Sequence, residues 1–112
     1  MADKFKDFRG VEFPACLRRL GFKDLSWGND AAARAAVDVG AGKVLVVWCL
    51  ARSRRARVDQ GDGITMRTPR FHGYVCRGRV DRDIHDDKRH ERPFLCETEA
   101  DLSKKVKERL SR

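Results

Sequence analysis

Arginine is the residue type through which this chain is best equipped to bind a partner, and the arginines are unevenly distributed along the sequence. Four arginines fall within six positions, directly after the apolar run K-V-L-V-V-W at 43–48, and four more follow up to position 79. The guanidinium group is planar and carries five N–H donors, so it binds phosphate or carboxylate oxygens in a bidentate way. The candidate contact residues are Arg52, Arg54, Arg55, Arg57, Arg67, Arg70, Arg77 and Arg79.

The overall charge of the chain also bears on the kind of partner that it could bind. The net charge is +8 and the isoelectric point is about 9.8, which is typical of a polyanion binder. If the strands expected at 43–51 and 64–80 pair, all eight arginines would fit on one edge and grip a nucleic acid or a ribonucleoprotein. Two alternatives stay open: an acidic surface of a protein partner, and a solvated loop. No helix-turn-helix, zinc-finger or RNP-type stacking signature is present.

An acidic and histidine-containing stretch, D-R-D-I-H-D-D-K-R-H at 81–90, is the candidate for metal binding. Asp81, Asp83 and His85 alternate, so on a strand they would share a face, and with Asp87 and His90 they have the ligand types for a divalent ion. Arginines and lysines are interspersed with these acids, so a mixed-charge loop explains the pattern as well. We predict no metal site and no cofactor.

The cysteines are scattered singly through apolar surroundings. Cys16, Cys49, Cys76 and Cys96 show no C-x-x-C spacing, so we expect buried, reduced thiols rather than a zinc site. His72 and Cys76 lie four residues apart and would share a strand face, which is the minimum for a thiol–base pair. No third, orienting group is identifiable. A metal-dependent or thiol enzyme is therefore the least favoured class, and we predict no catalytic residue.

The chain length sets the scale of the fold. A sequence of 112 residues predicts one domain over 1–112 that buries about two-thirds of its unfolded surface. The first ten residues are charged, which argues against a signal peptide, and no apolar run approaches the roughly 18 residues of a membrane span. We expect a cytoplasmic protein with no membrane contact.

The helices and strands that must position the arginines are predicted from the periodicity of apolar residues and from the positions of proline and glycine. Pro14 and Gly21 delimit a helix. Between Gly21 and Pro93, apolar runs and the alternation of apolar with polar residues favour strands. The elements expected are a helix at 12–21, strands at 22–27, 35–39, 43–51, 64–67 with 70–79, and 94–97, and a helix at about 99–111. Residues 1–10 are expected to be loosely ordered, and 52–63 and 81–92 to be mobile charged loops.

This order predicts an α+β fold of two layers. The sheet is antiparallel with three to five strands, and the short N-terminal helix and the C-terminal helix pack on one of its faces. Leu102, Val106 and Leu110 recur every four residues and form the apolar stripe of the last helix. An exposed sheet edge, only partly blunted by Pro69, would let two copies pair as a homodimer.

The stretch L-G-F-K-D-L-S-W-G-N-D at 20–30 resembles a group of small uncharacterised bacterial and phage α+β proteins. The resemblance covers about residues 14–51, and it departs from the group at Ala31, Ala32 and Ala33. It implies the fold and a phage or mobile-element context, and it carries over no activity. Trp27 is expected as a core anchor with Asn29 and Asp30 in a turn; the alternative is a recognition loop with an exposed Trp27.

Together these observations favour a small, non-enzymatic binding protein. The leading hypothesis is a phage or mobile-element protein whose basic face contacts nucleic acid or a ribonucleoprotein, with inhibition of host defence as its suggested role. The second is a protein-interaction module or regulator whose arginines meet an acidic partner surface.

Overall fold

The structure is a computed structural model, and it describes residues 11–26, 32–61, 63–80, 84–89 and 92–111. Its sheet is antiparallel in the order β1-β2-β3-β4-β5, and β6 pairs with β4 off this path. The strands are β1 (Lys23–Asp24), β2 (Ala33–Gly40), β3 (Lys43–Cys49), β4 (Phe71–Gly78), β5 (Ile84–Arg89) and β6 (Phe94–Cys96). The helices are α1 (Ala15–Arg19), α2 (Arg54–Val58) and α3 (Glu99–Leu110).

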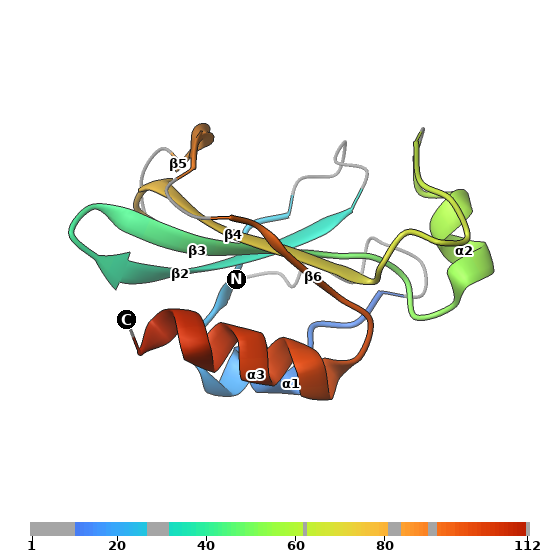
Figure 1. The fold of residues 1–112 in the computed structure, drawn as a ribbon, viewed down its shortest axis with the longest axis horizontal. Coiled ribbons are helices and arrows are strands. Elements are labelled where there is room, and N and C mark those ends of the chain that lie inside the picture. The colour runs from blue at the N-terminus through green and yellow to red at the C-terminus, as the bar shows by residue number, and fades with distance from the viewer. Residues whose placement is uncertain (1–10, 27–31, 62, 81–83, 90–91, 112) are drawn as a thin grey trace.

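The two-layer α+β prediction is confirmed. Helices α1 and α3 lie side by side under one face of the sheet, and α2 lies beyond the end of the sheet opposite the β2–β3 turn (Figure 1). The predicted hairpin at 35–51 forms as β2 and β3. No helix in the described part of the chain is long and apolar enough to cross a membrane.

The core between sheet and helices comes from one side of each strand. Leu45, Val47 and Cys49 of β3 alternate toward this side and pack with Leu102 and Val106 of α3. The intervening β3 residues face the other side, where a second, smaller buried cluster forms on the face without helices. Its fully buried members are Ala36, Val44, Val46, Tyr74 and Cys76. The continuous apolar run of β3 is therefore buried on both faces, as in a central strand.

The helix ends follow local rules. Gly21 follows α1 with a φ of +85°, the left-handed conformation that glycine adopts without strain. The Thr98 side chain caps α3 by accepting a hydrogen bond of 3.2 Å from the backbone N–H of Asp101. Helix α1 is shorter than the predicted 12–21, and Pro14 is its N-cap rather than a first-turn residue.

Two segments expected as mobile charged loops contain regular structure. Residues 52–63 include α2, which begins after Ser53, whose side chain accepts from the backbone N–H of Ala56. Residues 81–92 include β5, because strand pairing with β4 uses backbone groups and does not need an apolar pattern. Conversely, 64–67 forms no strand, and the predicted strand at 22–27 is the two-residue β1. The expectation for residues 1–10 lies outside the described part of the chain.

Candidate functional site

The strand register separates the eight candidate arginines into two groups. In the β3–β4 pair, Cys49 lies opposite Phe71 and Lys43 opposite Arg77. Arg77 and Arg79 therefore lie near the β2–β3 turn, while the candidates between 52 and 70 lie at the other end of β4. Eight residues at about 3.3 Å each separate these ends by more than 20 Å. The prediction of a single arginine-bearing edge is wrong.

Arg57 is the least accessible of the candidates. Its side chain is fully buried, although it belongs to the short helix α2. Its Nε donates to the carbonyl of Ala51 at 2.6 Å, and its Nη1 donates to the carbonyl of Thr68 at 2.9 Å. Its Nη2 donates to the carbonyl of Arg52 at 3.0 Å. The two remaining N–H groups form a bidentate pair with the Glu97 carboxylate, through Nη1 at 2.8 Å and through Nη2.

All five guanidinium donors of Arg57 are therefore used inside the protein. The contacts join the end of β3, the turn before α2, residues 64–68 and the connection from β6 to α3. Arg57 cannot contact a polyanion without losing them. Arg57 therefore has a structural role, and the prediction that it is a binding residue is wrong.

The acid that pairs with Arg57 is itself perturbed. The hydrogen bonds from Arg57 hold the pKa of the Glu97 carboxyl below its ordinary value, while partial burial acts in the opposite direction. The charges of Arg57 and of Arg54, whose Nη2 lies 3.2 Å from Glu97 Oε1, add to the lowering of this pKa. Arg54 also donates to the carbonyl of Met66 at 2.8 Å, so it too is held by its own chain.

This pKa shift predicts a pH dependence of stability. Because the pKa of Glu97 is lower in the folded than in the unfolded state, its contribution is present above the unfolded value and is lost as pH falls through the folded one. We expect Glu97→Gln to lower the melting temperature near pH 7, and the gap to wild type to narrow as pH falls to about 3. Thermal unfolding followed by circular dichroism between these pH values measures it.

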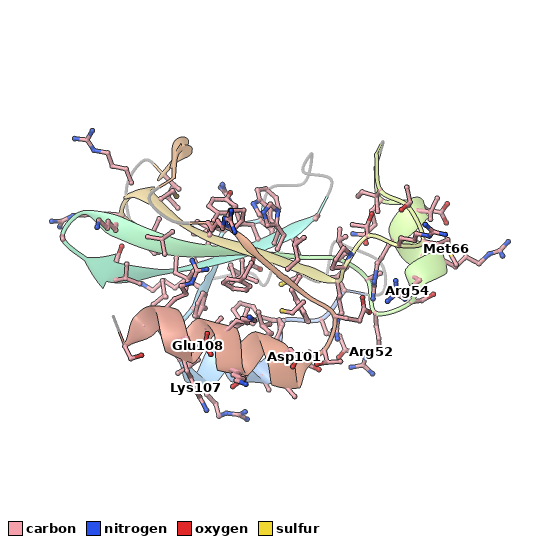
Figure 2. The ribbon with its side chains drawn as sticks, viewed as in Figure 1. Arg52, Arg54, Met66, Asp101, Lys107 and Glu108 are labelled. Atoms are coloured by element: carbon pink, nitrogen blue, oxygen red, sulfur yellow. The ribbon has the colours of Figure 1, made fainter. Side chains whose placement is uncertain are left out.

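The control for this experiment is Glu108→Gln on the exposed side of α3 (Figure 2). A gap for Glu97→Gln that stayed constant across the pH range would contradict the assigned titration.

Acids also partly neutralise two of the remaining arginines. Arg52 Nη2 lies 3.5 Å from Glu12 and 4.0 Å from Glu99. Arg70 is only 6% exposed; its guanidinium lies 3.8 Å from Glu99 and 4.6 Å from the ring centroid of Phe71. These contacts leave less charge for a partner than the sequence indicates.

Two candidates at the α2 end of the sheet stay available. Arg55 and Arg67 are exposed, and neither forms an ion pair with another described residue. "The α2 end" here means α2, residues 59–70 and β6. Figure 2 shows Arg54 and Met66 together at this end, away from Lys107 and Glu108 on α3.

A row of larger side chains crosses the sheet near this end, on the face without helices. Arg34 of β2 lies opposite Trp48 of β3, Trp48 opposite His72 of β4, and His72 opposite Leu95 of β6. Directly opposed residues of antiparallel strands are within contact distance on the same face. The Arg34 guanidinium lies 5.3 Å from the Trp48 ring centroid, and Trp48 Nε1 donates to the hydroxyl of Tyr74 at 2.8 Å.

A pocket opens beside this row, and we call it the Trp48 pocket. Its volume is about 320 Å³, and the segment between α2 and β4 supplies Ile64, Thr68, Pro69 and Arg70 to its lining. Its apolar lining comes from Trp48, Leu50, Ile64, Pro69 and Leu95. His72 and Arg70 also line it. The volume is at the lower end of the roughly 300–1,000 Å³ usual for ligand pockets.

Exposed apolar side chains gather at the same end. Within the described part of the chain, the large hydrophobic residues that are most exposed are Val58 at 42%, Met66 at 50% and Leu95 at 58%. They come from α2, from the segment that follows it, and from β6. A single exposed apolar residue is ordinary, but three at one end, where an apolar pocket also opens, make this end the candidate site.

The cysteines are free and buried, as predicted. Burial raises the pKa of the Cys16 thiol and that of Cys49, and it raises the pKa of Cys96 to about 11. Such thiols are poor nucleophiles at neutral pH. Cys76 faces the side of the sheet opposite to the other three, so the four cannot share one ion.

The thiol–base pair is excluded by distance. Four residues along a strand put the Cα atoms of His72 and Cys76 about 13 Å apart, beyond hydrogen-bond reach. No cluster that could hold a metal ion occurs among the residues that the structure describes. Most of the Asp/His stretch at 81–90, and Trp27, Asn29 and Asp30, lie outside the described side chains.

No protein-family model, no curated protein and no solved structure matches this chain. The resemblance of residues 20–30 therefore stays a prediction. The functional argument depends on the geometry of the α2 end.

Sequence reasoning missed the main residues of the α2 end and of the Trp48 pocket. Trp48 was part of an apolar run, and Met66, Val58 and Leu95 carried no motif. The usable signal was the parity of the strands: Trp48, His72 and Leu95 each flank a residue of the helix-covered core.

Proposed function

We propose that this protein is a non-enzymatic binding module, and that it binds a protein partner through the α2 end of the sheet. The observation that carries the proposal is the combination of exposed Val58, Met66 and Leu95 with the exposed cations Arg55 and Arg67, at the end of the sheet where the apolar Trp48 pocket opens. Protein interfaces are enriched in methionine, aromatic and arginine side chains and depleted of lysine and acids at their centres. The partner surface is acidic where it meets the arginines.

A nucleic-acid grip by the arginine stretch is less well supported by the same geometry. The guanidinium donors of Arg57 form hydrogen bonds within the protein, and Arg54 and Arg52 form ion pairs with acids of their own chain. Phosphate contacts need cations that are free to replace counterions. The net charge of +8 then acts mainly on the rate of association with an acidic partner.

Titration with labelled duplex and single-stranded nucleic acid separates the two functions. We expect weak binding that is gone by about 150 mM salt and that Arg55→Ala/Arg67→Ala weakens no more than Arg77→Ala/Arg79→Ala does. The second pair is the matched control, because it removes the same charge from the opposite end of the sheet. Useful affinity surviving at about 150 mM, with a slope of several phosphates that only the first pair lowers, would replace the proposal with nucleic-acid binding.

Capture with the same variants tests the protein partner directly. The immobilised wild-type protein and the Arg77→Ala/Arg79→Ala variant should retain the same protein from a cell lysate, and the Arg55→Ala/Arg67→Ala variant should lose most of it. Equal retention by all three would contradict the placement of the interface at the α2 end.

A further inference from the structure

We infer that the Trp48 pocket receives one apolar side chain, aromatic or branched aliphatic, from an extended acidic segment of the partner. This inference rests on the proposed function and adds the chemistry of the bound segment. An anchor side chain in a desolvated pocket, surrounded by weaker polar contacts, is the usual energetic centre of a protein interface.

The size and lining of the pocket select the kind of anchor. About 320 Å³ accommodates one large side chain and part of its neighbour rather than a folded element. Trp48, Leu50, Ile64 and Leu95 present apolar surface, and an occupying side chain would gain about 25 cal/mol for each Å² it removes from water.

The same lining argues against a nucleobase as the occupant. A base carries hydrogen-bonding edges, and these would lose water in the pocket. Of the residues that line it, Thr68, His72 and Arg70 have polar side chains, and Arg70 is committed to Glu99. Unpaired polar groups cost about 1–3 kcal/mol each, so an apolar anchor is favoured over a base.

The charges around the pocket select the flanking residues. The Arg34 guanidinium lies over the Trp48 ring, and the exposed Arg67 belongs to the segment that supplies Ile64 and Thr68 to the lining. No acidic residue is among the described residues that line the pocket. A segment with Asp or Glu beside its anchor would pair with the exposed Arg67, whereas a basic segment would be repelled.

Binding of short synthetic peptides, followed by fluorescence polarisation, tests the inference. The probe is a labelled ten-residue peptide with Asp and Glu flanks and one central Phe; companions replace the Phe by Leu or Ala, or the acids by Asn and Gln. We expect the Phe and Leu peptides to bind, the Ala peptide to bind at least about tenfold more weakly, and the amide peptide to lose both affinity and salt dependence.

Matched variants of the protein locate the anchor. Leu95→Gln at the pocket should weaken the Phe peptide about tenfold, whereas Ala15→Gln, at an exposed apolar residue of α1 on the helix-covered side of the sheet, should leave it within about twofold. Both side chains are exposed, so both variants are expected to fold, and circular dichroism checks that they do.

Three results would overturn the inference: no binding of any acidic peptide, equal binding of the Phe and Ala peptides, or equal effects of Leu95→Gln and Ala15→Gln. Tight binding of single-stranded nucleic acid that Leu95→Gln abolishes would assign the pocket to a base instead. If only the inference fails, capture of the partner is lost with Arg55→Ala/Arg67→Ala but kept with Leu95→Gln. If the proposed function fails, the nucleic-acid titration shows it.

Discussion

Replacement of Arg57 by methionine should be the most destabilising single change in the arginine stretch. The substitution leaves the Glu97 carboxylate with only the exposed Arg54 and removes the donor from three carbonyls, those of Ala51, Arg52 and Thr68. Arg57 is fully buried while Glu97 is partly exposed, so the loss arises mainly at the three carbonyls left without a donor, at about 1–3 kcal/mol each, and we expect about 3–5 kcal/mol in total. At about 4 °C per kcal/mol for a domain of this size, the melting temperature should fall by about 12–20 °C.

Neighbouring substitutions make this result specific. Arg55→Met changes an exposed residue of the same helix and should alter stability by less than about 0.5 kcal/mol. Arg57→Lys keeps the charge but offers three donors and no planar fork, so it should fall between wild type and Arg57→Met. Equal melting temperatures for Arg55→Met and Arg57→Met would contradict the structural role of Arg57.

A double-mutant cycle with Glu97→Gln isolates the pair itself. If the bidentate contact is formed, the effects of Arg57→Met and Glu97→Gln on the free energy of unfolding should be clearly non-additive. Glu97 is partly exposed, and water can solvate it once Arg57 is gone. Glu97→Gln alone should therefore cost less than Arg57→Met.

The fold was predictable where one element imposes a strong pattern. The apolar run of β3, the glycine turn before it and the capping residues of α3 are local signals, and the hairpin and the last helix followed from them. Helix α2 was not predictable in this way. It has five residues and no apolar stripe. Hydrogen bonds from Arg57 to Thr68 and Glu97, which are distant in the sequence, hold it in place.

The site was predictable only in part, because a sequence shows which cations are present but not which are already paired. Glu97 and Glu99 were visible only as neighbours of a helix cap, yet they form ion pairs with Arg54, Arg57 and Arg70. Trp48, His72 and Leu95 are far apart in the chain, and only the strand register makes them neighbours. A surface formed by cross-strand contacts can therefore be predicted only once the strand register is known.

A glycine in β4 fixes how β6 lies on the sheet, and its replacement should have the second large effect. Gly73 lies opposite Phe94, and a Cβ built on Gly73 would lie 2.2 Å from Cζ of the Phe94 ring. The ring therefore lies over the glycine backbone, on the side of the sheet that α3 covers. Phe94 is 5% exposed and belongs to the core with Leu102 and Val106, so it has little room to move.

Gly73→Ala should accordingly lower the free energy of unfolding by about 3 kcal/mol or more, the upper part of the range for overpacked cores. Arg77→Ala, an exposed position of the same strand, is the matched control and should stay within about 0.5 kcal/mol of wild type. Urea denaturation measures both. A neutral Gly73→Ala would show that the Phe94 ring rotates away freely.

The smaller side chain of Phe94→Leu should relieve part of the clash, so the double variant Gly73→Ala/Phe94→Leu should lose less than the sum of the single losses. This pair also connects the core to the proposed interface. Leu95 follows Phe94 in β6 and lies opposite His72, which precedes Gly73, so the contact that seats the ring also sets the position of Leu95 at the Trp48 pocket. Gly73→Ala should therefore weaken the Phe peptide even where the protein remains folded, while Arg77→Ala should not.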